Sequence, residues 1–194
     1  MGQKPNKFDK MFEPYKDYFL ENTHVPVLAR QTNGEYVAKD CYLVEFAVKP
    51  DLETRQKICM VCEPFDFIDS VQYEIVRLKY FSEPVTPRLF ILAAPAAIEH
   101  DFFVMDDLLA MAFCIDSEKY TTLKLFEVNY KFRHKYIGTK KYADVGTSAI
   151  NALKQIYKKS EIRGKSVMDA LYFWQKNGFT DMDNRPLYLH WRQR

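Results

Sequence analysis

Six segments of the chain are rich in apolar, β-branched and aromatic residues over five to eight positions, a pattern typical of strands. The third and fourth are joined by the polar turn 116–119, so we expect an antiparallel hairpin there. Pro50 and Pro95 close the first two, because proline cannot continue a hydrogen-bonded strand. The six segments are 42–48, 88–93, 108–115, 121–128, 161–167 and 187–191.

Apolar positions recur at spacings of three or four in four further segments, which predicts helices there. Asp51 is placed to cap the first of them. Gly146 lies inside the third, where it costs about 1 kcal/mol relative to alanine and is a point at which the helix can break. Gly178 is expected to end the fourth as a left-handed cap. The four segments are 51–64, 67–78, 142–156 and 168–177.

This order of strands and helices predicts an α/β (α+β) domain with three layers, in which helices flank a mixed, mainly antiparallel sheet. A chain of 194 residues with 47% hydrophobic residues is long enough to bury one core, which excludes a disordered protein. Residues 1–35 mix prolines with aromatic residues, and we expect them to form an arm packed on the domain. The domain itself is expected over residues 36–194.

The charge balance gives no reason to expect a nucleic-acid or membrane partner. The formal net charge is +2, and neither an apolar run long enough to cross a bilayer nor a hydrophobic leader is visible, so we expect a cytoplasmic protein. The carboxyl-terminal half is more basic, but it lacks a ribonucleoprotein signature and a zinc finger. The basic residues concerned are Lys140, Lys141, Lys154, Lys158, Lys159, Arg163, Lys165, Arg192 and Arg194.

Two groups of residues outside any larger motif are candidate binding sites. Cys59 and Cys62 have a C-x-x-C spacing, but a second pair and a nearby histidine cluster are missing from the sequence, so buried thiols are expected and no metal site. An acidic stretch from Glu99 to Asp107 has the charge to attract a cation or a protonated amine, but a solvated loop is the preferred explanation.

Residues 125–139 and 170–179 form two segments that resemble motifs of the GNAT superfamily of N-acyltransferases. The first is 125–139, which is similar to the acyl-CoA-binding motif: a valine, a short spacer, and then Arg-x-x-Gly-x-Gly or Gln-x-x-Gly-x-Gly where a helix starts. The second is 170–179, which is similar to a late helix that ends in Phe-Tyr-Glu-Lys-Leu-Gly-Phe. The matching positions are Val128, Phe132, Arg133, Lys135, Ile137 and Gly138 in the first, and Phe173, Lys176, Gly178 and Phe179 in the second.

The resemblance implies transfer of an acyl group from acetyl-CoA, or another acyl-CoA, to an amine on a small molecule or a protein. A strand that ends beside a helix start directs free backbone N–H groups and the positive end of the helix dipole at one point. With three basic side chains nearby, this predicts a cradle for a pyrophosphate over residues 133–139; a solvated basic turn is the alternative. The implied cofactor-binding residues are Phe126, Val128, Arg133, His134, Lys135, Tyr136, Ile137, Gly138, Thr139 and Trp174.

Two positions depart from the family pattern, and both concern the chemistry. Tyr136 stands where the first glycine is expected, and Trp174 stands where a tyrosine usually protonates the departing thiolate. Indole cannot replace phenol as an acid in this pH range. Glu127 is the acidic residue of its strand and the candidate general base, facing opposite to Phe126 and Val128 unless a bulge reverses it. A GNAT-like protein without turnover, which binds coenzyme A or another protein, is therefore the alternative function.

Overall fold

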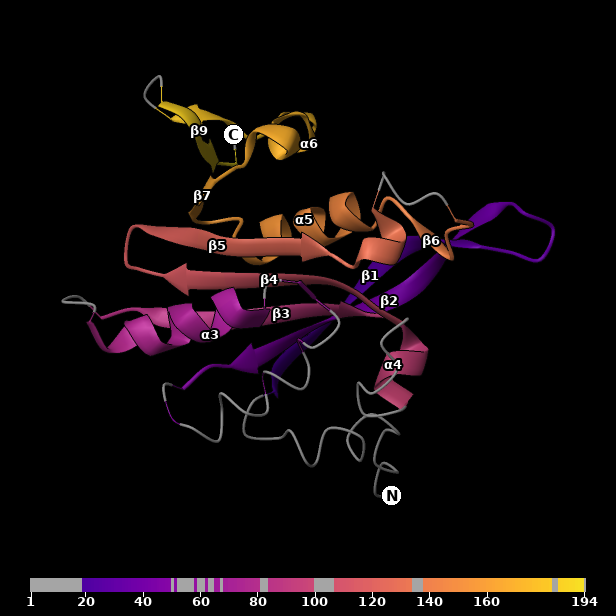
Figure 1. The fold of residues 1–194 in the computed structure, drawn as a ribbon, viewed down its shortest axis with the longest axis horizontal. Coiled ribbons are helices and arrows are strands. Elements are labelled where there is room, and N and C mark those ends of the chain that lie inside the picture. Colours follow the sequence, from indigo (N-terminus) through magenta and orange to yellow (C-terminus); the bar gives the residue numbers. More distant parts are fainter. Residues whose placement is uncertain are drawn as a thin grey trace.

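The computed structural model describes a single large sheet with helices on both faces (Figure 1). In the part of the chain that it describes, nine strands follow the order β6-β1-β2-β3-β4-β5-β7-β9-β8. Neighbouring strands are antiparallel except β5 and β7, which are parallel. The described residues are 19–49, 51, 58, 62, 65–66, 68–80, 84–99, 107–133, 138–182 and 185–193.

The strands are two to twelve residues long. They are β1 Phe19–Arg30, β2 Tyr36–Ala47, β3 Thr86–Ala93, β4 Leu108–Asp116, β5 Tyr120–Val128, β6 Tyr142–Ala143, β7 Glu161–Lys165, β8 Thr180–Met182 and β9 Arg185–Trp191. The α-helices are α3 Ile68–Arg77, α4 Pro95–Glu99, α5 Val145–Ile156 and α6 Leu171–Lys176. Short 3-10 turns are η2 Leu78–Tyr80, η4 Tyr130–Phe132 and η5 Met168–Ala170.

The predicted fold class is confirmed, and so are most of the predicted elements. The hairpin of β4 and β5 forms around the turn 116–119, where the Ser117 amide donates to the Tyr120 carbonyl at 3.0 Å. Helix α3 and strands β3, β7 and β9 lie within or beside their predicted ranges. Gly178 has a φ of 75° just beyond α6, as a left-handed cap requires.

Several elements differ from the prediction. Residues 19–30 form β1, which is paired along its length with β2 inside the sheet, although we expected an arm there. The helix expected from residue 142 begins at Val145, because Tyr142 is taken up by β6, and it continues through Gly146 without a break. Strands β6 and β8 and helix α4 were not predicted. The expected helix 51–64 and the arm residues 1–18 lie mostly or wholly outside the described residues.

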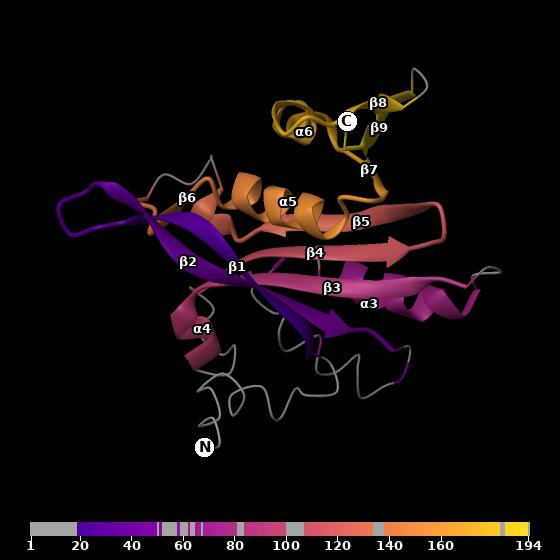
Figure 2. The same cartoon turned by 180° about the vertical axis from the view of Figure 1, so that it is seen from behind.

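Helices α3 and α5 cover opposite faces of the sheet (Figures 1 and 2). Strand β4 lies between the two cores and is buried at eight of its nine positions, so its sequence is a continuous apolar run rather than an alternation. Figure 2 shows α6, β8 and β9 at the edge of the sheet beyond α5 and β5. Within the described residues, no helix has the length and apolarity that crossing a membrane requires.

An ion pair between partly exposed Arg88 and buried Glu45 links the middle strands. The Arg88 guanidinium binds both carboxylate oxygens of Glu45 at 2.5 Å, and it also contacts Asp116 at 3.2 Å. The side chain of Glu45 is only 3% exposed. The ring of Tyr157 on the α5 side lies 5.3 Å from the same guanidinium. Strands β2, β3 and β4 and the end of α5 therefore meet at one charged group.

Replacing Arg88 with leucine is expected to lower the free energy of unfolding by about 3–5 kcal/mol, because Glu45 is left buried without its partner. Urea unfolding followed by circular dichroism measures the change. Arg77→Leu is the control: it removes a partly exposed pair with Glu74 and should cost less than about 1 kcal/mol. Equal losses in the two variants would contradict the role given to Arg88.

Candidate functional site

A β-bulge in β5 sets the direction of the side chains at the candidate site. Cys114 on β4 faces Leu123, and the next residue back, Phe113, faces Leu125, so Lys124 is the extra residue. Leu123 belongs to the core on the α5 side, whereas Leu125 packs on the α3 side. Beyond the bulge the alternation is regular again.

Glu127, the predicted base, lies after the bulge, between Phe126 and Val128. Phe126 and Val128 pack against the core on the α5 side. Glu127 points to the α3 side, where its carboxylate accepts from the Asp66 amide at 3.1 Å. The bulge lies before these residues and does not reverse them. The prediction that Glu127 faces away from Phe126 and Val128 is therefore confirmed.

The parallel strands β5 and β7 separate soon after they meet. They are paired only from Tyr120–Glu161 to Leu123–Gly164, and the described residues of β7 give the second half of β5 no partner. A cavity of about 400 Å³ lies in the resulting gap. Its lining comes from β5, from β7 and the turn after it, and from the region of α6: residues 123–128, 133, 164–167, 170, 173, 174, 179 and 189.

The second half of β5 turns part of its backbone toward this gap. The backbone N–H of Asn129, just after β5, donates to the backbone carbonyl of Leu109 in β4 at 2.9 Å. These two residues are therefore a hydrogen-bonded pair of the antiparallel ladder. Residues 126 and 128 then direct their N–H and C=O groups away from β4, toward the gap. The Val128 carbonyl accepts from Arg133 Nε at 2.7 Å, which is consistent with that direction.

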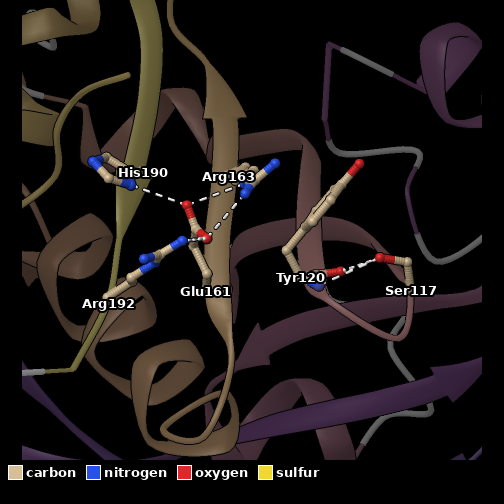
Figure 3. Close-up of polar contacts among 6 residues, drawn as sticks. All are labelled: Ser117, Tyr120, Glu161, Arg163, His190 and Arg192. Carbon is tan, nitrogen blue, oxygen red and sulfur yellow. Dashed lines mark hydrogen bonds and ion pairs between the residues drawn. The ribbon is translucent and has the colours of Figure 1, made fainter. Parts of the chain in front are cut away.

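The narrow end of the gap, its vertex, is held by charged and aromatic contacts (Figure 3). The Arg163 guanidinium lies 4.0 Å from the centre of the Tyr120 ring, which joins β7 to β5. The buried carboxylate of Glu161 accepts from Arg163 at 3.0 Å and from Arg192, and it lies 2.9 Å from His190 Nδ1, which joins β7 to β9. Two cations of the basic carboxyl-terminal half thus bind a glutamate inside the molecule.

These contacts also set the acidity of Glu161. Burial alone would raise the pKa of Glu161, but the hydrogen bonds from Arg163, Arg192 and His190 outweigh it and lower the pKa to about 2. The carboxylate is therefore charged throughout the physiological range, and it fixes the positions of β7 and β9 at the vertex.

Aromatic rings form the wall of the gap on the α5 side. Phe126 of β5 stacks on Phe173 of α6, with ring centres 5.8 Å apart and planes 15° apart. Trp174 contacts Phe126 at 5.4 Å and Phe179 at 5.1 Å, both edge to face. All four rings line the cavity. Trp174, Phe126 and Val128, three of the predicted cofactor-binding residues, thus line the same cavity, and their role in binding stays a prediction.

The start of α5 approaches two residues of the cavity lining, Val128 and Phe173. A Cβ atom at Gly146 would lie 3.0 Å from the Phe173 ring and 3.2 Å from Val128 Cγ2, and both of those residues line the cavity. Only glycine allows this close approach without a shift. Asp144, with a φ of 51°, precedes the helix and makes no side-chain capping hydrogen bond. The first N–H groups of α5 are therefore not capped by Asp144.

The predicted pyrophosphate cradle over 133–139 does not coincide with a helix start. Gly138 and Thr139 are exposed and precede α5 by several residues, and residues 134–137, which include His134, Lys135, Tyr136 and Ile137, lie outside the described residues. Arg133 is bound to Glu127 and, at 3.0 Å, to Asp66. The helix begins at Val145, seven residues after Gly138, and Arg133 is engaged in ion pairs.

The segment 141–146, and not 133–139, leads directly into α5. Its sequence is Lys-Tyr-Ala-Asp-Val-Gly. The basic Lys141 is followed three residues later by Asp144, which has a positive φ, and two residues after that by Gly146, which closely approaches Val128 and Phe173. Lys141 binds buried Asp107 at 2.5 Å, which anchors this segment. The sequence feature that could have located the start of α5 is Asp144. Aspartate tolerates the left-handed conformation, and small residues follow it at the start of a helix with periodic apolar positions.

Glu127 and Arg133 form an ion pair at the edge of the cavity. The Glu127 side chain is 3% exposed and that of Arg133 is 39% exposed. Asp66, at 68%, is the exposed member of the group. Glu127 thus stands beside the gap with its carboxylate already bound by a guanidinium, and its role as a base stays a prediction.

Replacing Glu161 with glutamine is expected to flatten the acid dependence of stability. A carboxylate whose folded pKa is depressed stabilises the fold above its unfolded pKa, near 4.5, and that contribution disappears as the pH falls toward 2. The depression corresponds to about 3 kcal/mol. Unfolding by urea at pH 2 to 7 measures it. Glu118→Gln, in the exposed turn before β5, should keep the wild-type profile, and identical profiles for all three proteins would contradict the assignment.

Comparisons with known proteins give a distant likeness. No protein-family model and no curated protein matches the sequence. Among solved structures five chains match. One is a PaiA N-acetyltransferase from Thermoplasma acidophilum in complex with coenzyme A, which is 16% identical, has a TM-score of 0.39, and is matched over 76% of this chain and 96% of that chain. This likeness is too distant to assign a function.

Proposed function

We propose that this chain binds an acyl-CoA in the gap between β5 and β7 and transfers the acyl group to an amine. The observation that carries the proposal is the early separation of two parallel strands, which leaves backbone groups of β5 facing a cavity. Apolar walls with a few convergent polar groups are typical of small-molecule sites, and 400 Å³ is within their usual range of about 300–1,000 Å³.

The pantetheine arm of coenzyme A has the chemistry to occupy the unpaired edge of β5. It is an extended chain with two amide groups, so it can hydrogen-bond to a strand as a further strand would. Residues 126 and 128 offer N–H groups in that direction, while their flanking rings and methyl groups suit the methylenes of the arm. The Val128 carbonyl is already bound by Arg133, so we expect the N–H groups to contribute most.

The diphosphate of the coenzyme is assigned to the start of α5. Helix N-termini stabilise anions through their free N–H groups and the helix dipole. The start of α5 lies against Val128 and Phe173 of the cavity lining, so an arm lying along β5 as far as Val128 brings the diphosphate near these N–H groups. The resemblance of 141–146 to the expected motif spacing supports the same placement.

Transfer requires the amine nitrogen to attack the thioester carbonyl, the carbon–sulfur bond to break, and a proton to leave the attacking nitrogen. Holding the two reactants together supplies much of the acceleration in such reactions. Glu127 is the carboxylate of the cavity lining, but Arg133 and the Asp66 amide bind it, and it lies beside Val128 at the diphosphate end of the arm, so in this placement water takes the proton. Trp174 has no acidic proton for the thiolate, which would take its proton from water.

The competing function is a coenzyme-binding protein without turnover. Two observations favour it: the Glu127 carboxylate is bound by Arg133, and Trp174 stands where an acid is expected. The two functions share the binding site and differ in product formation. A thiol-release assay with acetyl-CoA and a panel of amines and peptides separates them, since binding without release of coenzyme A would leave only the competitor.

Isothermal calorimetry with coenzyme A is expected to show binding that Gly146→Ala weakens about tenfold, which corresponds to about 1.4 kcal/mol. The added methyl group would lie 3.0 Å from Phe173, so the start of α5 must move away from the gap. Asn151→Ala, on an exposed position of the same helix, is the matched control and should bind like the wild type. Absence of binding to the wild-type protein would overturn the proposal.

A further inference from the structure

We infer that Lys124, at the bulge of β5, accepts an acyl group from the bound coenzyme, so that the protein acylates itself at this side chain. The inference rests on the proposed function, because it needs an acyl-CoA in the gap between β5 and β7. It goes beyond that function by naming a modification site within the chain. Three features support it: where the thioester lies, from which side of the sheet an amine reaches it, and which amine stands there.

The thioester of the coenzyme lies level with the bulge of β5. Val128 and Leu123 face Ala110 and Cys114 of β4, so the stretch between them spans four steps of that strand, or about 13 Å at about 3.3 Å for each step. The pantetheine arm between the phosphate oxygen and the sulfur has about twelve chain bonds, equivalent to about four residues of extended backbone, which is the same length. With the diphosphate beside Val128, the sulfur and its acyl group therefore reach Leu123 and Lys124.

Aromatic rings close the gap on the α5 side, where Phe126, Phe173 and Trp174 contact one another. The lining on the other side of the sheet includes Lys124 and Leu125, and both side chains face α3. The rings therefore leave the α3 side as the direction from which an amine reaches the thioester carbonyl.

The ammonium group of Lys124 is held on this side by Glu74 of α3. Lys124 Nζ lies 3.8 Å from Glu74 Oε2, and the two side chains are 27% and 14% exposed. Lys124 is the extra residue of the bulge, and bulges redirect side chains next to functional sites. The ion pair thus keeps an amine beside the thioester end of the cavity, on a flexible stem that can swing toward the carbonyl.

Acyl transfer to this amine needs no reactant besides the acyl-CoA and water. One proton leaves the Lys124 ammonium group to water, and the freed nitrogen forms a bond to the thioester carbonyl carbon. The carbon–sulfur bond then breaks, and a second proton from the nitrogen ends on the departing thiolate. The products are an amide on Lys124, coenzyme A and one proton in solution. Because donor and amine are held in one cavity, the step is faster than the same reaction between separate molecules.

The acylated side chain fits the same surroundings. Its amide nitrogen keeps one N–H, which can donate to Glu74, whose buried Oε2 accepts no hydrogen bond within the described part of the chain. The other oxygen of Glu74 accepts from Arg77 at 3.5 Å, so the carboxylate keeps a cationic partner when acylation removes the charge of Lys124. The acyl group then occupies the thioester end of the gap, so we expect one acyl group for each chain.

Lys165 is the second lysine of the cavity lining and the rival for the acyl group. It follows Gly164, the last residue of β7 that pairs with β5, so it also stands near the vertex. Its side chain is exposed, and its Nζ lies 5.6 Å from the centre of the Tyr188 ring on β9. Since β9 lies on the far side of β7 from β5, this contact draws the ammonium group away from the gap and favours Lys124.

Mass spectrometry of the intact full chain after incubation with acetyl-CoA tests the inference. We expect a gain of about 42 Da, the mass of one acetyl group, and peptide mapping should place it on Lys124. Lys124 should be labelled at least about a hundredfold faster than the exposed Lys159, because the donor is bound beside it. An excess of coenzyme A should suppress the labelling, and the rate should be independent of protein concentration.

Lys124→Arg is the test variant, because arginine keeps the positive charge beside Glu74 but does not act as the nucleophile. It should lose the single acetyl group. Lys159→Arg, at an exposed position beyond α5, is the matched control and should be acetylated at Lys124 like the wild type. If Lys124→Arg does not fold, as judged by circular dichroism, the peptide map of the wild-type protein decides by itself.

The outcomes separate this inference from the proposed function. Calorimetric binding of coenzyme A without acetylation of the chain would overturn self-acylation and leave the proposed function standing. An acetyl group on Lys165, labelling spread over exposed lysines, or a rate that rises with protein concentration would also overturn self-acylation at Lys124. Absence of coenzyme A binding would overturn the proposed function, and the inference with it.

Discussion

Strands β5 and β7 pair over only four residues, and the candidate site exists because that pairing stops. Up to Leu123 and Gly164 the sheet is continuous; beyond them the second half of β5 keeps β4 on one side and faces a cavity on the other. Backbone N–H and C=O groups of a buried strand need partners. An unpaired stretch inside a sheet is therefore a place where an extended ligand can supply the hydrogen bonds that a strand does not.

The elements around the gap hold it open from three sides. Glu161 and Arg163 fix β7 to β9 and β5 at the vertex. The rings of Phe126, Phe173 and Trp174 connect β5 to α6 across the wall. Lys154 of α5 donates to the Asn177 carbonyl at the end of α6, and burial lowers the pKa of this lysine. These contacts connect the carboxyl-terminal elements to the rest of the domain along the margin of the cavity.

The strands and helices with clear periodicity could be predicted from the sequence, because their apolar positions alone determine which face is buried. The facing of Glu127 followed from alternation and held, since the bulge at Lys124 precedes it. The helix start could not be predicted in the same way. Arg133 matched a motif by spacing, but buried Glu127 binds it, and the chain needs several more residues and the left-handed Asp144 before α5 begins. Such ion pairs depend on tertiary contacts that spacing does not encode.

Amide hydrogen exchange at residues 126, 127 and 128 tests the central claim most directly. In the free protein the amides of Phe126 and Val128 should exchange quickly, while that of Glu127, directed at β4, exchanges slowly. Adding an acyl-CoA should slow Phe126 and Val128 and leave Glu127 unchanged. Slow exchange at all three residues without ligand would show that the edge of β5 is already paired, and it would contradict an open gap between β5 and β7.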